Sequence, residues 1–154
     1  MNNKTIPIDY ANSLMYEMQK AFYDERGKGA RFRMTTVGRD YFAKNCLPLL
    51  QSSEINQILQ TIEKFLQNEG IAGKVSYDSD DRLLRVRIEG CLHRQVEDKM
   101  IAHEVEPFTC VPANWIVLAI EEKLDRPVEL AEIKLEDGAC QLLLVVFDHR
   151  PTLG

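Results

Sequence analysis

Cysteine and histidine residues between positions 91 and 110 are the best candidates for chemistry in this sequence. Cys91 and His93 are separated by a single residue, where a strand is expected to end. Because alternate residues of a strand project to the same side, a thiolate and an imidazole there could meet on one metal ion. His103 or Cys110 could complete the ligand set, and Cys140 supplies a further thiol. This grouping predicts a thiol-based module that binds zinc or iron or senses redox state.

The same residues have a plainer interpretation. The cysteines include no C-x-x-C pair, so no standard zinc-ribbon or thioredoxin motif is present. Free cysteine is among the most commonly buried residue types, and Cys91 would then be a core thiol beside a surface histidine. A third interpretation is that His93 or His103 ligates the metal of a tetrapyrrole, because neutral imidazole is a common axial donor.

Signals for catalysis are few. The sequence has no G-x-S-x-G, H-E-x-x-H, P-loop or G-x-G-x-x-G motif. A Cys–His nucleophile pair remains open, either Cys91 with His93 or Cys110 with His103. No Asn or Asp is singled out to orient the base, so the sequence favours a binding protein over an enzyme.

The composition is that of one globular domain. The chain has 154 residues, of which 45% are hydrophobic and 28% are charged. Its net charge of -5 disfavours a phosphate-backbone binder, so nucleic acid is not expected as a partner. No apolar stretch approaches the roughly 18 residues of a membrane span, and the N-terminus lacks the apolar region of a signal peptide. We therefore expect a cytoplasmic protein.

Apolar periodicity predicts the order of the elements. A spacing typical of helices covers residues 9–26, 37–48, 54–68, 93–104 and 110–124, and two hairpins are expected over residues 73–89 and 128–148. This order, ααα-ββ-α-α-ββ, predicts an α+β fold with a mostly antiparallel four-stranded sheet packed with helices. The run Leu142–Phe147 is apolar at every position, which predicts a central strand covered on both faces.

The first predicted helix carries an apolar stripe that we expect to face the core. The stripe consists of Ala11, Leu14, Met15, Met18, Ala21 and Phe22. Leu14, Met15 and Met18 have the alternative of forming a dimer face, since Met-rich stripes adapt to partners. Residues 1–36 are accordingly interpreted as a packing or dimerisation element, 37–148 as the main domain and 149–154 as a tail.

The last third of the chain carries three linked patterns. Cys110-Val-Pro-Ala-Asn-Trp115 opens a buried helix, Glu121–Glu132 follows it, and Asp137-Gly138 precedes Cys140 and an apolar strand. In this order and spacing the chain resembles the 4-vinyl reductase domain family, over about residues 37–148. The resemblance implies a fold that holds an apolar small molecule between helices and sheet and often dimerises. Haem nitric-oxide sensors and Golgi transport tethering subunits share that fold.

The resemblance also implies a metal site. The family's ligands are a cysteine before the buried helix, a Glu-x-x-Cys on the next strand and a cysteine after the following turn. Cys110, Glu132 and Cys140 match the first, second and last of these ligands. Leu135 stands where the pattern has its second cysteine. A structural zinc needs four donors in tetrahedral geometry, so this departure leaves the set one ligand short.

Apolar walls and polar anchors for a ligand are also present. The candidate wall residues are Phe42, Phe65, Trp115, Val117 and Leu118, and the candidate anchors for a carboxylate are Arg31, Arg33 and Arg39. Together with the resemblance they predict non-catalytic binding of a tetrapyrrole or acyl lipid by a homodimeric carrier, sensor or assembly factor, in chlorophyll metabolism or photosystem assembly. The prediction requires a hollow beneath the Trp115 helix. Alternatively these aromatics are ordinary core and the protein is a ligand-free scaffold for a protein partner.

Overall fold

A computed structural model describes residues 5–32 and 36–148, with only the backbone of residues 31 and 32. Within these residues the chain forms the expected α+β fold. The helices are α1 (Ile8–Arg26), α2 (Arg39–Asn45), α3 (Ile55–Asn68), α4 (Arg94–Ala102) and α5 (Val111–Leu124), with short 3-10 helices η1 (Gly27–Phe32) and η2 (Leu47–Leu49). The strands are β1 (Lys74–Asp80), β2 (Leu83–Glu89), β3 (Val128–Glu136) and β4 (Ala139–Val146).

The strands form one antiparallel sheet in the order β1-β2-β4-β3. Each hairpin closes through a short polar turn. The β3–β4 turn has Asp137 and Gly138 at φ values of 53° and 77°, the left-handed conformation that a two-residue hairpin loop requires. β4 therefore lies between β2 and β3, which confirms the central position predicted for this strand.

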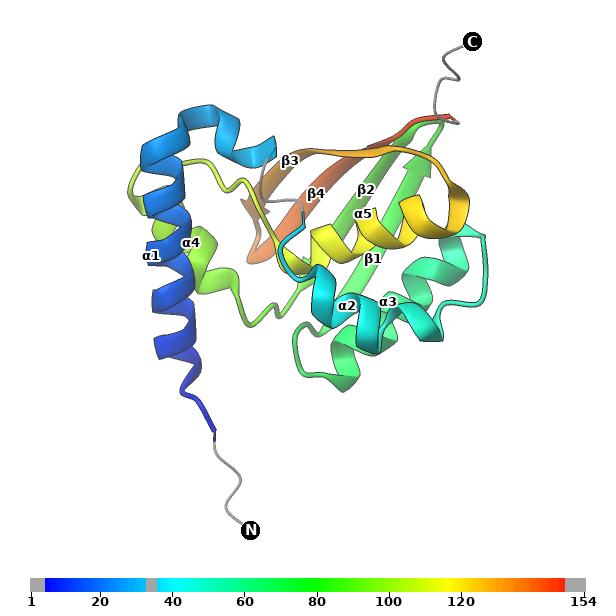
Figure 1. Ribbon diagram of the computed structural model, residues 1–154, viewed down its shortest axis with the longest axis horizontal. Helices are drawn as coiled ribbons and strands as arrows, with labels where there is room; N and C mark the ends of the chain where they lie inside the picture. Colours follow the sequence, from blue (N-terminus) through cyan, green and yellow to red (C-terminus); the bar gives the residue numbers. More distant parts are fainter. Residues whose placement is uncertain (1–4, 33–35, 149–154) are drawn as a thin grey trace.

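Helices α3 and α5 cover one face of the sheet, and α2 lies beside them (Figure 1). β4 alternates between fully buried residues that face these helices and half-buried residues such as Leu143 on the other face. The prediction that β4 is covered on both faces is therefore wrong. The open face is shielded in part by long neighbouring side chains, because Arg85 of β2 lies opposite Leu143 in the sheet register.

Helix α5 is buried on nearly all sides. Pro112 stands in its first turn, where a missing N–H costs nothing, and Asp125 ends it in the left-handed conformation at φ 52°. Trp115 and Ile116, in its middle, are at most 2% exposed. The all-round apolar sequence of this segment thus marks a core helix. Within the described residues, no helix has both the length and the apolarity needed to cross a membrane.

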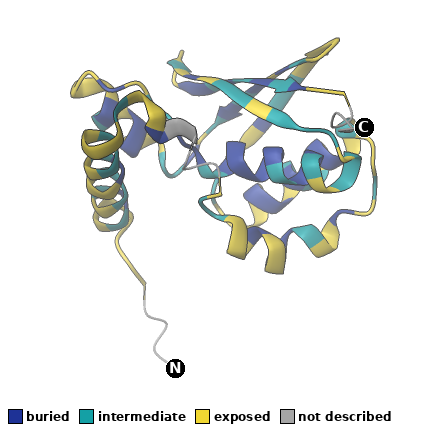
Figure 2. Ribbon diagram, turned by 45° about the horizontal axis from the view of Figure 1, so that its top comes forward, coloured by how far each residue is buried: buried dark blue, intermediate teal, exposed yellow. Residues whose placement is uncertain are grey.

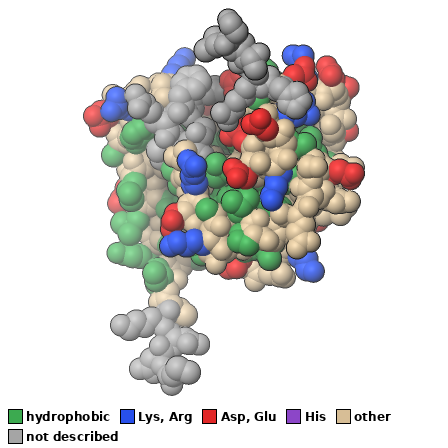
Figure 3. Space-filling model, turned by 45° about the vertical axis from the view of Figure 1, so that its right-hand side comes forward, with side chains coloured by type: hydrophobic (Ala, Val, Ile, Leu, Met, Phe, Trp, Pro, Cys, Tyr) green, Lys and Arg blue, Asp and Glu red, His purple; other side chains and the backbone are tan. Residues whose placement is uncertain are grey.

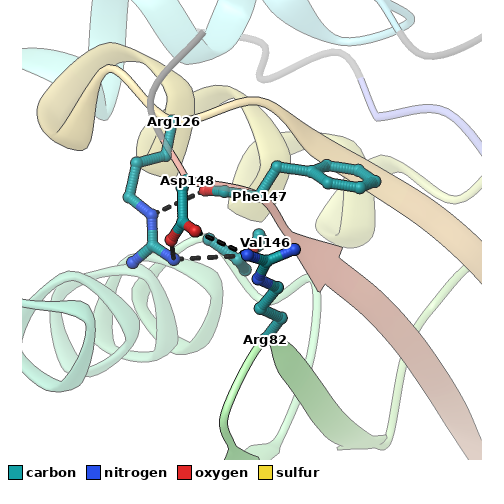
Figure 4. Close-up of polar contacts among 5 residues, drawn as sticks. All are labelled: Arg82, Arg126, Val146, Phe147 and Asp148. Carbon is teal, nitrogen blue, oxygen red and sulfur yellow. Dashed lines mark hydrogen bonds and ion pairs between the residues drawn. The ribbon is translucent and has the colours of Figure 1, made fainter. Parts of the chain in front are cut away.

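The end of β4 is tied to two neighbouring turns (Figure 4). Arg82 Nη2 lies 2.6 Å from Asp148 Oδ2, and Arg126 Nη2 lies 3.6 Å from Asp148 Oδ1. Arg126 Nε also donates to the Phe147 carbonyl at 2.7 Å. Asp148, which both ion pairs share, is largely exposed, so the pairs position this end of the sheet more than they stabilise it.

Helix α1 stands apart from the core, beside α4 (Figures 1 and 2). Among the described residues, none of α1 belongs to the apolar core cluster. Its buried side chains are Asn12 and Gln19, whereas Leu14 and Met18 are exposed. The prediction of a core-facing stripe is therefore wrong. Of the predicted stripe, Leu14, Met18 and Ala21 are exposed, and Ala11, Met15 and Phe22 are half-buried outside the core cluster.

Candidate ligand-binding groove

The aromatic residues predicted to line a hollow pack against one another. Trp115, Phe42 and Phe65 are at most 5% exposed. The Trp115 ring centroid lies 5.6 Å from that of Phe65, 6.3 Å from that of Phe42 and 5.9 Å from that of Tyr41. Such distances are those of packed aromatic pairs. The rings therefore fill the space around Trp115, as core residues do.

A backbone contact holds the Trp115 ring in place. Its Nε1–H donates to the Gly38 carbonyl at 2.9 Å. Gly38 has φ 92°, and a Cβ at this position would lie 2.7 Å from Trp115 Nε1. Only glycine allows the chain to pass this close to the indole.

The other predicted ligand contacts do not form one site with these rings. Val117 is buried in the core, two residues and thus about 200° around the helix from Trp115. Leu118 is half-buried and Arg39 is exposed at the start of α2. Arg33 and the side chain of Arg31 lie outside the described residues. The predicted pairing of these arginines with a ligand carboxylate stays a prediction.

Three of the predicted metal ligands gather instead around a buried carboxylate that sequence reasoning missed. Cys91, Cys110 and Cys140 are buried, and each lies within electrostatic range of Glu97. The Cys140 thiol donates to Glu97 Oε2 at 3.8 Å. Burial, and next the Glu97 charge, raise the pKa of Cys110 and Cys140 well above the usual value for a thiol. Burial likewise raises the pKa of Cys91 to about 11. These thiols are neutral at pH 7 and thus poor nucleophiles.

Glu97 on α4 is the carboxyl group of this cluster, and its pKa is strongly raised. It is 4% exposed, and burial together with the neighbouring Asp98 charge raises its pKa to about 7. The Cys140 hydrogen bond and Arg94 lower it in part. Arg94 itself donates to the Gly138 carbonyl at 2.7 Å. The sequence signal for Glu97 is a charged residue between Val96 and Met100 on the apolar face of α4.

The predicted convergence of Cys91 and His93 does not occur on a strand. β2 ends at Glu89, and His93 instead stands at the N-terminal end of α4. Its Nδ1 lies 3.0 Å from Asn12 Oδ1, while Asn12 Nδ2 donates to the Leu92 carbonyl at 2.8 Å. Burial lowers the pKa of His93, which favours a neutral ring that donates from Nδ1 to Asn12. His93 is thus part of the contact between α1 and α4.

The remaining predicted metal ligands lie elsewhere. The His103 ring packs on that of Tyr16 with centroids 5.5 Å apart. Glu132 is exposed on β3, where it pairs with Lys134 at 3.1 Å. Leu135, at the position of the missing family cysteine, lies opposite Cys140 in the sheet register. Over residues 5–32 and 36–148, no three His, Cys, Asp or Glu side chains are placed to hold one metal ion.

An open groove lies between the C-terminal end of α1, the segment 104–108 and β3. Its volume is about 1030 Å³. Apolar and aromatic side chains make up most of its lining: Tyr23, Ile101, Val105, Pro107, Phe108, Leu130, Ala131, Ile133, Leu135 and Leu143. The Tyr23 and Phe108 rings stack with centroids 5.9 Å apart. Of the predicted site residues whose side chains are described, only Glu132 lines it.

The charged side chains of the groove are mainly acidic. They are Glu104, Glu106, Glu132, Glu136, Lys28 and Lys134. Lys134 is already paired with Glu132, so the acidic character dominates. An apolar wall with a few charged groups is the usual form of a small-molecule site. Sequence reasoning missed this groove because it interpreted Pro107 only as the end of a helix. The available signal was the mixture of apolar and acidic residues around Pro107.

No protein-family model matches this chain, and no curated protein matches it. The groove is therefore identified by its geometry and chemistry.

Proposed function

We propose that this protein is a non-catalytic binder of an amphipathic small molecule, held in the groove between α1, the segment 104–108 and β3. The observation that carries the proposal is the groove itself, about 1030 Å³ in volume with apolar residues contributed by all three sides. Ligand sites typically measure about 300–1,000 Å³, so an acyl chain or a flat ring system fits.

The charge of the groove selects among ligands. The glutamates of the lining outnumber its two lysines, so the free propionates of a tetrapyrrole would meet net like-charge repulsion there. An acyl lipid with an uncharged or positively charged polar group would avoid this repulsion. We therefore assign the groove to acyl lipids of this kind. Carrier, sensor and assembly-factor roles, in photosystem assembly or elsewhere, would all begin with this binding step.

Binding is favoured over catalysis by the state of the reactive groups. The thiols of Cys91, Cys110 and Cys140 are neutral and buried. Glu97, the acid with a pKa near neutrality, does not line the groove. None of these thiols, nor Glu97, therefore reaches a molecule bound there.

Among the residues that the structure describes, the zinc or iron alternative lacks a suitable donor set. The thiols and Glu97 share one region of the core, yet they are not placed around a common point that could hold an ion. A leucine also stands opposite Cys140, where the family pattern supplies a thiolate. We therefore derive no function from a metal.

Calorimetric titration with two amphipathic probes tests the proposal. Dodecyltrimethylammonium and dodecanoate share a chain and differ in charge, and both are used below their micellar concentrations. We expect the cationic probe to bind at least roughly tenfold more tightly, because the lining is acidic. Failure of both probes to bind, or tighter binding of dodecanoate, would overturn the assignment.

A pair of variants locates the binding site. Ile101 lines the groove and is 46% exposed, whereas Leu49 on η2 is 54% exposed outside it. Ile101→Lys should weaken binding of the cationic probe roughly tenfold, because it removes apolar wall and adds a like charge. Leu49→Lys should leave the affinity unchanged. Equal affinities in the two variants would place binding elsewhere.

A further inference from the structure

Helix α1 exposes its apolar face. Tyr10, Leu14 and Met18 are 60%, 42% and 71% exposed and follow one another at intervals of four residues. Ala21 continues the same stripe, and hydrophobic side chains line the edge of the molecule that rises from the N-terminal residues (Figure 3). We call Tyr10, Leu14, Met18 and Ala21 the outer stripe of α1.

The inner side of α1 does not explain the outer stripe. The main contacts of α1 are with α4 and η1. At the α4 side they include the hydrogen bonds of the buried Asn12 amide with Leu92 and His93, and at its C-terminal end the Tyr16 ring packs on His103. A contiguous exposed apolar face on a protein surface marks an interaction site.

We propose that the outer stripe is a homodimer interface, in which two α1 helices pack antiparallel about a twofold axis. A twofold contact requires a surface that complements itself. Leu14 and Met18 lie on either side of the middle of α1, so an antiparallel crossing places Leu14 of each copy against Met18 of the other. The 19 residues of α1 span about 28 Å, and a helix pair of that length buries on the order of 1,000 Å², the lower limit for a specific dimer.

Charge favours the same arrangement. Glu25 lies at the C-terminal end of the outer stripe, and the N-terminal end of α1 begins at Pro7 without a side-chain cap. Antiparallel pairing brings each Glu25 towards the positive end of the other helix dipole. A membrane surface is a less suitable partner for the stripe, because helices that bind anionic lipid are rich in Lys and Arg. Helix α1 also carries the acidic residues Asp9, Glu17 and Asp24, which anionic lipid would repel.

Sedimentation equilibrium of the full chain from low to high micromolar concentration tests the proposal. We expect a reversible dimer of twice 17.7 kDa. Leu14→Glu and Met18→Glu should each weaken association at least about 100-fold, because a carboxylate would be buried against the partner. Leu49→Glu, at a residue of similar exposure on η2, should dimerise like the unmodified chain.

Three outcomes would overturn the proposal. They are a monomer at every concentration, a dimer that survives both glutamate substitutions, and a monomer that sediments with phosphatidylglycerol vesicles through the stripe. Circular dichroism of each variant controls for folding, and Met18→Gln provides a milder substitution. The dimer is independent of the groove, so failure of one proposal leaves the other standing.

Discussion

The two parts of this molecule bury opposite kinds of side chain. Under the sheet, α3 and α5 bury aromatic and aliphatic residues such as Trp115 and Ile62. On α1 itself the buried side chains are amides, Asn12 and Gln19, while Leu14 and Met18 face outward. The difference teaches that periodicity in the sequence defines which residues share a helix face. Which helix face becomes core depends on which helices pack against the sheet.

The largest effect should come from the apolar part. Trp115→Ala removes a side chain that is 2% exposed and its hydrogen bond to Gly38. We expect a loss of about 4 kcal/mol in the free energy of unfolding, from lost burial and the cavity left behind. Urea denaturation followed by circular dichroism measures it. A loss below about 1 kcal/mol would mean that the aromatic cluster is not the core.

Glu97 should make stability depend on pH. Its folded pKa of about 7 exceeds the ordinary 4.5, so the folded state holds a proton that the unfolded state releases. The contribution of Glu97 to stability is therefore greatest below pH 4.5 and falls by about 3 kcal/mol as the pH rises to 7 and above. Glu97→Gln should match the unmodified chain near pH 4.5 and exceed it at pH 8.

The difference between these two proteins across the pH range isolates Glu97 from other groups. His93, whose pKa is lowered by burial, acts in the opposite direction, because its contribution is lost as the pH falls below 6.5. It is present in both proteins and cancels. Parallel stability curves would show that Glu97 is solvated in the folded state.

The polar contact between α1 and α4 should contribute less. Asn12→Ala removes the bonds to Leu92 and His93 and leaves their polar groups without a partner. We expect a loss of about 2 kcal/mol, measured by urea denaturation. Asn45, whose amide donates to the Tyr41 carbonyl on the surface, is the matched control. Asn45→Ala should cost less than about 0.5 kcal/mol.

The smallest effect is expected on the outer stripe. Leu14→Ala at concentrations too low for association should change stability by less than about 0.5 kcal/mol, because this side chain is 42% exposed. The same substitution at Leu66, which is fully buried in α3, should cost about 3 kcal/mol. Similar losses at both positions would remove the contrast between the two parts.

The fold could be predicted where local signals are strong. The helix over 54–68 and both hairpins follow from clear periods of 3.6 and 2, and the structure confirms their type and order. The central place of β4 follows from its continuous apolar run. These features depend on neighbours in sequence, which a pattern records directly.

The site could be predicted only in part, because it depends on contacts between distant segments. The sequence brings attention to Cys91, Cys110 and Cys140, and the structure gathers them, but Glu97 enters from a helix whose packing no pattern specifies. Trp115 looks the same in sequence whether it lines a hollow or fills one. The groove combines segments far apart in sequence, so its existence follows only from the folded arrangement.

The tryptophan and most of the tyrosines lie in different parts of the protein, so their optical signals report on different parts. Its one tryptophan lies in the aromatic cluster beneath α5, while three of its five tyrosines, Tyr10, Tyr16 and Tyr23, lie on α1. Indole emission will therefore report unfolding of the sheet and its covering helices, and it will change little when α1 detaches. Near-ultraviolet signals from the phenol rings will register that detachment first.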